Sequence, residues 1–265
     1  MEEIIEEKEM KLFFKTGIIV LSIIAVFFSS IKYIPQVVTV TGQSNEKKMP
    51  IHKVERNEKV ISLTFDVDRN DKNLDQVLEL LNKYKVKASF FVTGTWVDDN
   101  PDELKKILFH GHDIGNHGDN HKHMDLLSKE DCEKEIINLH NKVKEITGID
   151  MKLFRPPYGD YNNTVIYTAK NLGYQSIKWS IDSEDWKNYS KEDIVNKCRQ
   201  KDTLDKGSII LFHTGTKFTL EALEEVILFF EEENYALVPV SKLIYLEDFT
   251  VDISGVQQRK QSVIY

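Results

Sequence analysis

The stretch Val60-Ile-Ser-Leu-Thr-Phe-Asp-Val-Asp68 decides the fold class, because an apolar run rich in strand-forming residues ends abruptly in carboxylates. Its apolar pattern indicates a strand buried on both faces, as in the centre of a parallel sheet. Such a strand delivers Asp66 and Asp68 to the carboxyl edge of the sheet, where α/β folds place their chemistry. A lone acid at a strand end often only caps the next turn, so the rest of the chain must decide its role.

Outward from this stretch, strands and helices alternate along the chain. Further strands are predicted at 86–92, 153–155, 175–181, 208–212 and 236–240. Helices are predicted at 73–84, 100–109, 128–147, 163–172, 190–200 and 220–233. This alternation predicts an α/β fold of parallel strands joined by right-handed crossovers, either a barrel or an open sheet.

The chain is expected to divide into a membrane anchor and one soluble domain. Residues 1–15 are rich in Glu and Lys and predict a cytoplasmic N-terminus, whereas residues 16–31 carry no charge. We therefore predict one uncleaved transmembrane helix at 16–34, although a buried core helix is the alternative. The basic residues before the span favour a single-pass protein of the cell membrane, with its catalytic domain outside the cytoplasm. A linker at 35–58, the domain at 59–246 and a peripheral tail at 247–265 complete the prediction.

The net charge and the cysteine content limit the kinds of binding partner that the chain can have. The formal net charge of −8 argues against a nucleic-acid partner, because phosphate binding requires a basic field. Cys132 and Cys198 match no metal-binding spacing and are expected to be small, partly buried residues. We expect a monomer.

Two histidines four residues apart suggest a metal site. His117 and His121 lie in the segment Gly115-Asn-His-Gly-Asp-Asn-His121. On a helix or in a tight turn this spacing places both imidazoles on one side, suited to zinc or another divalent ion. The alternative is a pair of ordinary surface histidines. The neighbouring His110, His112 and His123 do not share the spacing and are treated as background.

Three later strand ends carry groups suited to the same chemistry. The segment Phe154-Arg-Pro-Pro-Tyr-Gly-Asp160 fixes a cation in a rigid loop, and an Arg there can hold a carboxylate in a bidentate pair. Trp179-Ser-Ile-Asp-Ser-Glu-Asp-Trp186 ends in acids and aromatics. His213 ends a buried strand, placed as a general acid or base would be. Each signal is modest alone, but together they indicate one catalytic edge.

Five short segments, taken in order, resemble the five motifs of the polysaccharide deacetylase family, also called the NodB homology domain or carbohydrate esterase family 4. They are Thr64-Phe-Asp66, His117-x3-His121, Arg155-Pro-Pro-Tyr-Gly159, Asp182-Ser-Glu-Asp-Trp186 and Leu211-Phe-His213. The resemblance spans residues 59–245 and implies a distorted (β/α)7 barrel. It also implies metal-dependent removal of acetyl groups from N-acetylated sugars. The third and fourth motifs are most similar to a membrane-anchored, sporulation-associated branch that acts on cell-wall, peptidoglycan-like glycan.

The resemblance implies roles for the matched side chains. Asp66 resembles the catalytic base, and Arg155 would hold it. His117 and His121 resemble ligands of a divalent metal, with zinc expected and cobalt or manganese as alternatives. Such a metal acidifies water and polarises a carbonyl, which is the activation that amide hydrolysis needs.

The remaining matches concern the leaving group and the substrate pocket. His213 resembles the general acid that protonates the departing nitrogen, and Asp185 would orient it. The backbone at Tyr158 would help to bind the oxyanion. Trp186 and Leu211 would wall the acetyl pocket.

One position departs from the family pattern. The first motif usually reads Thr-Phe-Asp-Asp-Gly, and its second Asp is the third metal ligand, whereas this chain has Val67 there and Asp68 next. Residues 66 and 68 share one face of an extended strand, so Asp68 replaces the ligand only if the chain bends beyond Asp66. Otherwise the metal rests on two histidines and water, or Asp66 is itself a ligand. Two alternatives to an active deacetylase follow: a weakened or inactive family member that only binds glycan, and a structural protein of the cell surface.

Overall fold

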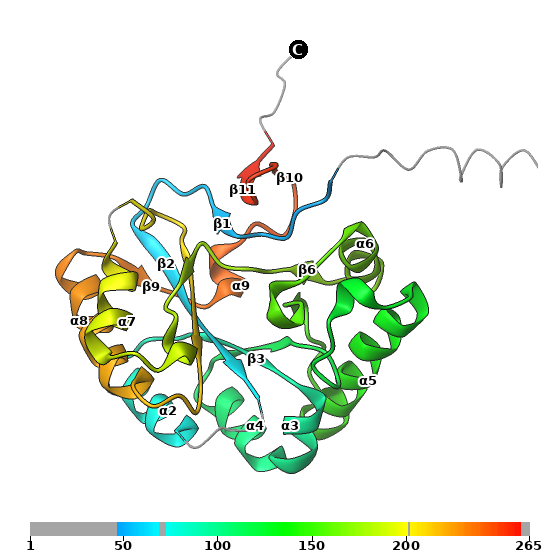
Figure 1. Ribbon diagram of the computed structural model, residues 1–265, viewed down its shortest axis with the longest axis horizontal. Coiled ribbons are helices and arrows are strands. Elements are labelled where there is room, and N and C mark those ends of the chain that lie inside the picture. Colours follow the sequence, from blue (N-terminus) through cyan, green and yellow to red (C-terminus); the bar gives the residue numbers. More distant parts are fainter. Residues whose placement is uncertain (1–46, 69–72, 201, 261–265) are drawn as a thin grey trace, which may run out of the picture. The chain divides into compact units, whose positions relative to one another are not determined.

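The computed structural model describes residues 47–68, 73–200 and 202–260 (Figure 1). The predicted N-terminus at 1–15, the transmembrane helix at 16–34 and the first part of the predicted linker lie outside the described residues. Among the residues that are described, no helix combines the length and the apolar character needed to cross a membrane.

A curved parallel sheet is the centre of the described domain. Seven strands follow the order β6-β5-β4-β3-β2-β8-β7, and every pairing along this order is parallel. This arrangement is a parallel half-barrel, which confirms the predicted α/β class and a sheet path of seven parallel strands (Figure 1). The strands are β2 (Val60–Val67), β3 (Ser89–Val92), β4 (Asp113–Asn116), β5 (Leu153–Phe154), β6 (Gln175–Ser176), β7 (Ile181–Asp182), β8 (Ile209–His213) and β9 (Ala236–Leu237), which pairs with β2.

β2 occupies the middle of this sheet, as its sequence predicts. All eight of its residues are buried, because β3 and β8 flank it and the core packs on both faces. The ring of Phe65 stacks between those of Phe90 and Phe212, with centroids 5.0 and 5.7 Å away. A strand so enclosed can expose only its end, and that end carries Asp66.

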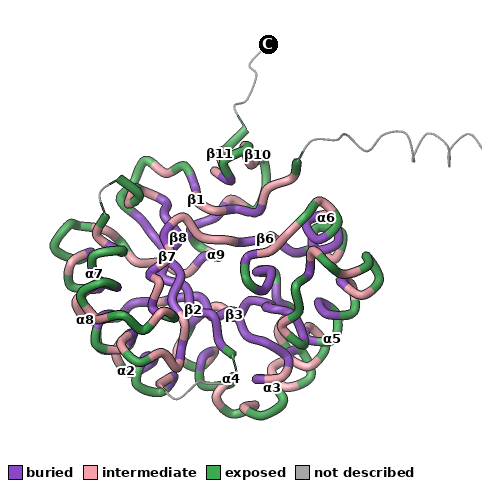
Figure 2. The backbone as a smooth tube through the Cα atoms, viewed as in Figure 1, coloured by how far each residue is buried: buried purple, intermediate pink, exposed green. Residues whose placement is uncertain are grey.

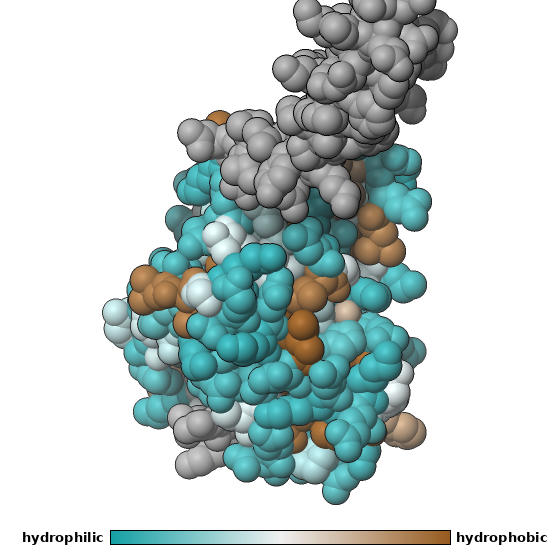
Figure 3. Space-filling model, turned by 90° about the vertical axis from the view of Figure 1, so that its right-hand side faces the viewer, coloured by the Kyte–Doolittle hydropathy of each residue, from teal (hydrophilic) through white to brown (hydrophobic). Residues whose placement is uncertain are grey.

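Helices cover the outside of the sheet, each with buried residues on one side and exposed residues on the other (Figure 2). Figure 3 shows that the side carrying α5 and α6 is mostly hydrophilic, with separate small hydrophobic areas. The helix α5 begins where the side chain of Ser128 accepts a hydrogen bond from the backbone N–H of Asp131, and it ends at Gly148 with φ 75°. The helices are α2 (Leu74–Lys83), α3 (Gly94–Asp99), α4 (Pro101–Phe109), α5 (Lys129–Thr147), α6 (Asn163–Asn171), α7 (Lys191–Arg199), α8 (Thr219–Glu232) and α9 (Val240–Leu243).

The secondary structure differs from the prediction at α3, at β4, at the segment 175–181 and at Val240, where α9 begins within the strand predicted at 236–240. α3 and β4 were not predicted, since both are short and contain glycine. The strand predicted at 175–181 is two strands, β6 and β7, at opposite ends of the sheet order. The apolar pattern marks a buried segment but does not show that the chain leaves one partner, β5, and joins another, β8.

The predicted linker and tail are partly wrong, because their described residues belong to the folded domain. β1 (Lys53–Val54) from the expected linker pairs with β11 (Val256–Arg259) from the expected tail, and β10 (Phe249–Val251) pairs with β11. Gln257 is fully buried, and its side chain both donates to the carbonyl of Tyr245 and accepts from its N–H. The folded residues therefore extend beyond 59–246 at both ends.

Replacing Gln257 by Leu should lower the free energy of unfolding by about 1–3 kcal/mol, because two buried backbone groups of Tyr245 lose their partners. Urea denaturation followed by circular dichroism measures this change. The neighbouring Gln258→Leu, at a partly exposed position, is the control and should change stability by about 0.5 kcal/mol or less. Equal stability of the two variants would contradict a packed C-terminal strand.

Candidate active site

The carboxyl ends of the parallel strands bring the predicted motifs together. Asp66 near the end of β2 is directly opposite His213 at the end of β8. His117 follows β4, and Arg155 follows β5. The sheet register, rather than sequence proximity, gathers these side chains at one edge.

A buried ion pair fixes the carboxylate of Asp66. Arg155 is fully buried, and its Nη1 donates to Asp66 Oδ1 at 2.6 Å. Its Nη2 donates to Thr64 Oγ1 at 2.9 Å, and its guanidinium lies 4.0 Å from the ring centroid of Phe91. Burial raises the pKa of Asp66, but the charges of Arg155, His117 and His213 and the hydrogen bond from Arg155 together outweigh burial, so the net pKa is lowered. The carboxylate is thus ionised, and its Oδ2, which Arg155 does not bind, is the oxygen that can accept a proton or contact a cation.

His117 and His121 present their Nε2 atoms to each other. These atoms are 3.3 Å apart, and His117 Nε2 lies 3.4 Å from Asp66 Oδ2. Two ligands bound to one tetrahedral ion at about 2.0–2.1 Å lie roughly 3.3 Å apart, so the spacing fits a shared cation. His117 Nδ1 donates to the carbonyl of Arg155 at 2.8 Å, which leaves its Nε2 lone pair for a metal.

Burial keeps both imidazoles in the form that binds metals. Desolvation lowers the pKa of His117 to about 4 and also lowers the pKa of His121. Metal ligation requires the neutral imidazole. The two side chains therefore fit a divalent cation at neutral pH without first losing a proton.

The loop that carries these histidines is a turn and not a helix. The side chain of Asn116 accepts from Gly118 N–H at 2.9 Å and donates to the carbonyl of Ile136 at 2.8 Å. Gly118 has φ 78° and His121 has φ 54°, so the chain reverses between the two ligands. Asn116 therefore anchors the turn to α5.

The third predicted ligand does not join the two histidines in one compact group. Asp68 is exposed, although its charge acts on His121 and favours the protonated imidazole. Val67 is fully buried and opposite Val92 in β3. Within the described ranges, the group of three acidic, His or Cys side chains with all ligand atoms within 4.8 Å is a different one, formed by His123, Asp125 and Asp160. The role of Asp68 stays a prediction.

A second buried carboxylate orients His213. Asp185, in the short helix η3 (Asp185–Lys187), is fully buried and its Oδ1 accepts from His213 Nδ1 at 2.8 Å. Its Oδ2 accepts from the backbone N–H of His213 at 2.7 Å and from Thr219 Oγ1 at 2.6 Å. Burial lowers the pKa of His213, but the hydrogen bond and charge of Asp185 outweigh burial and raise the pKa overall. His213 is therefore suited to donate a proton from Nε2.

The predicted pocket residues lie around these groups. Tyr158, in η2 (Pro157–Gly159), has φ 60° and a half-exposed ring with its centroid 4.5 Å from that of His121. Trp186 is half exposed beside Asp185, whereas Leu211 is buried in β8. Their assignment to an acetyl pocket stays a prediction.

Sequence reasoning missed the residues that hold the site from behind. Thr64 supports Arg155, Asn116 supports the histidine turn and Thr219 supports Asp185. Thr64 and Asn116 lie in the quoted segments, so inspection of their hydrogen-bonding capacity would have singled them out. Thr219 carries no sequence signal, because its partner is 34 residues away.

Replacing Asp185 by Asn should lower the pKa of His213, because the imidazolium loses its negative partner. Histidine NMR titration of the labelled protein measures this pKa. Glu184→Gln is the matched control, since Glu184 pairs with Lys187 and Lys197, and it should leave the titration unchanged. An unaltered pKa in Asp185→Asn would show that this pair does not govern His213.

Comparison with known proteins agrees with this geometry. A family model described as polysaccharide deacetylase matches residues 53–177. The chain is 38% identical over 196 residues to a peptidoglycan-N-acetylglucosamine deacetylase of Bacillus cereus, covering 72% of this chain and 91% of that protein. It is 31% identical to the peptidoglycan-N-acetylmuramic acid deacetylase PdaA of Bacillus subtilis, covering 71% and 72%.

Solved structures show the same fold. Bacillus subtilis PdaA, a family 4 carbohydrate esterase, superposes with a TM-score of 0.69 at 30% identity, covering 73% of this chain and 84% of that one. BA3943 of Bacillus anthracis, described as a family pseudoenzyme, has a TM-score of 0.70 at 28% identity, covering 79% and 73%. A mutant of it is described as having restored enzymatic activity. Because one relative shares 38% identity over nearly its whole length, and all five motifs meet at one sheet edge, this chain belongs to the polysaccharide deacetylase family, carbohydrate esterase family 4.

Proposed function

We propose that this chain is a metal-dependent hydrolase that removes N-acetyl groups from peptidoglycan. The observation that carries the proposal is the juxtaposition of an ionised, Arg-held Asp66 with the facing Nε2 atoms of His117 and His121. The described relatives that act on peptidoglycan sugars support the substrate class. Those relatives differ in the sugar that their names give, which is N-acetylglucosamine for one and N-acetylmuramic acid for the other.

The chemistry begins with activation of water. His117 and His121 would hold a divalent cation, expected to be zinc with cobalt or manganese as alternatives, which would acidify water and polarise the substrate carbonyl. Asp66 Oδ2 accepts the proton of the attacking water. Arg155 binds Oδ1, so the carboxylate cannot rotate away and stays ionised until the proton arrives.

The second half of the reaction needs an acid and an oxyanion site. His213, held by Asp185 and protonated because its pKa is raised, donates from Nε2 to the departing nitrogen. The backbone N–H of Tyr158 stabilises the oxyanion. Trp186 and Leu211 enclose the acetyl methyl group, and the freed products are acetate and an amino sugar.

The cellular setting is part of the same proposal. The predicted transmembrane helix at 16–34, which carries no charge from 16 to 31, would anchor the protein in the cell membrane, with the domain outside the cytoplasm where wall glycan lies. A role in sporulation is supported only by the form of the third and fourth motifs. We place the protein there as a monomer.

A glycan-binding protein without turnover is the second candidate function, favoured by Val67 in place of the family's third ligand. The description of Bacillus anthracis BA3943 as a pseudoenzyme shows that the fold exists without activity. Retention of Asp66, Arg155 and His213 in one hydrogen-bonded arrangement supports the enzyme, because a binder needs none of them.

Chelation separates the two candidates. We expect the full chain to release acetate from N-acetylated peptidoglycan. Acetate release should stop after chelator treatment and resume after addition of zinc or cobalt, because the reaction needs the cation at His117 and His121. Acetate is measured by a coupled assay, with heat-denatured protein as the blank. Glycan binding without acetate release under any metal would support the binder instead.

Asp66→Asn distinguishes a base from a metal ligand. As a base, Asp66 contributes about 10²–10⁴-fold to the rate, so the variant should lose that activity and keep its zinc. Metal content is measured by mass spectrometry beside acetate release. Loss of zinc in Asp66→Asn would make Asp66 a ligand.

Asp68→Ala should lower metal content and rate together if Asp68 is the third ligand. Asp98→Ala, at an exposed surface ion pair, is the control.

A further inference from the structure

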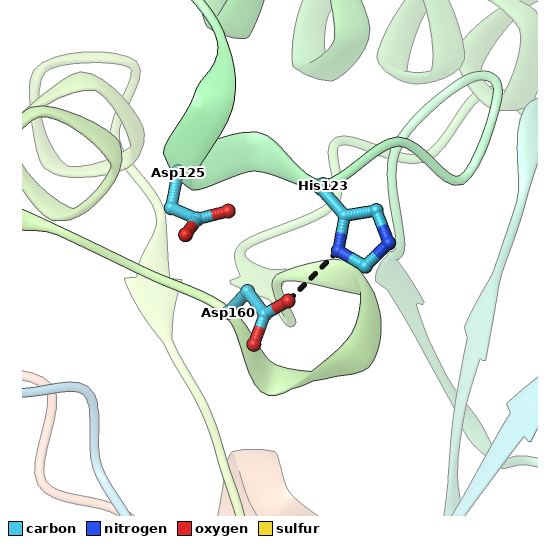
Figure 4. A group of neighbouring side chains, drawn as sticks. All are labelled: His123, Asp125 and Asp160. Carbon is cyan, nitrogen blue, oxygen red and sulfur yellow. Dashed lines mark hydrogen bonds and ion pairs between the residues drawn. The ribbon is translucent and has the colours of Figure 1, made fainter.

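A second cluster of metal-ligating side chains lies beside the active site. His123 precedes η1 (Met124–Leu126), Asp125 lies within it, and Asp160 follows η2. One ligand atom from each lies within 4.8 Å of the others. Figure 4 shows the three side chains converging from two separate loops. None of the three belongs to the group around Asp66.

One oxygen of this cluster lacks a partner. Asp125 Oδ1 is shielded from solvent and forms no hydrogen bond with any described residue. His123 Nδ1 is paired with Asp160 Oδ2 at 2.8 Å, so the imidazole serves one carboxylate. A shielded carboxylate oxygen without a donor is costly, and a bound cation is one of the groups that resolves such a site.

We propose that His123, Asp125 and Asp160 bind a second divalent cation. One imidazole and two carboxylates suit zinc, manganese or cobalt. Bonds of about 2.0–2.2 Å place ligand atoms at most roughly 4.4 Å apart, so only a small inward movement of the side chains is needed. With three protein ligands the remaining positions hold water, and the exposed His123 makes the site accessible from solvent.

The cation would connect the two loops that shape the active site. The ring of His123 stacks on that of Tyr158 with centroids 3.9 Å apart and planes at 12°, and the ring of His121 lies 4.5 Å from the same tyrosine. Tyr158 has φ 60°, a left-handed conformation that is strained for a non-glycine residue and needs support from its surroundings. The cation would hold His123 against Tyr158 and so fix the backbone that binds the oxyanion. This role, but not the binding itself, rests on the proposed function.

Counting bound zinc tests the proposal. The untagged full chain is stripped with chelator and dialysed against zinc, and bound metal is measured by mass spectrometry. Wild type should bind two equivalents. Asp125→Asn and Asp160→Asn should each bind one. Asp150→Asn, which breaks a surface pair of the same type with His140, is the matched control and should retain two.

A complementary variant protects the test against misfolding. The double variant His117→Ala/His121→Ala should still bind one equivalent of zinc. Adding Asp125→Asn to this double variant should remove that equivalent. Zinc binding by Asp125→Asn and Asp160→Asn equal to that of wild type would overturn the second site. Acetate release that persists in that case would leave the proposed function standing. Two equivalents of zinc without any acetate release would instead remove the proposed function and keep the cation site.

Discussion

The buried ion pair between Arg155 and Asp66 is the constraint on which the rest of the site depends. A charge at the centre of a closed core is tolerated only when it is paired and hydrogen-bonded, and removing one partner from such a pair typically costs about 3–5 kcal/mol. Arg155 satisfies this condition through Asp66 and Thr64, and its own carbonyl accepts from His117. One residue therefore sets both the carboxylate and the first imidazole. The strand β2 that carries Asp66 is fully enclosed, so this geometry has little freedom to relax.

Two buried carboxylates of the same site have opposite consequences for their neighbours. Asp66 faces Arg155 and stays ionised, whereas Asp185 faces His213 and keeps it protonated. His117 stays neutral, because burial lowers its pKa by more than the charge of Asp66 raises it. Environments that push titratable groups apart in this way separate the functions of base, ligand and acid within a few ångströms. The chemistry proposed for the chain uses each group in the protonation state that its surroundings favour.

The sequence predicts local features well and long-range partners poorly. β2, α4 and α5 follow from apolar spacing, a proline at a helix start and a glycine at a helix end, all of which act within a few residues. The split of 175–181 into β6 and β7, and the pairing of β1 with β11, depend on segments far along the chain and were missed. At the site, the motif residues reach the predicted edge, because strand polarity alone directs them there. Thr219 and the position of Asp68 could not be predicted, because they depend on how loops of different strands meet.

The proposed chemistry requires that the ends of separate strands hold one cation between His117 and His121. Anomalous X-ray scattering at the zinc edge, from crystals of the protein loaded with zinc, locates that cation directly. We expect a peak about 2.0–2.1 Å from the Nε2 atoms of both histidines, close to Asp66. A fully loaded crystal with no anomalous peak between these two imidazoles would contradict it.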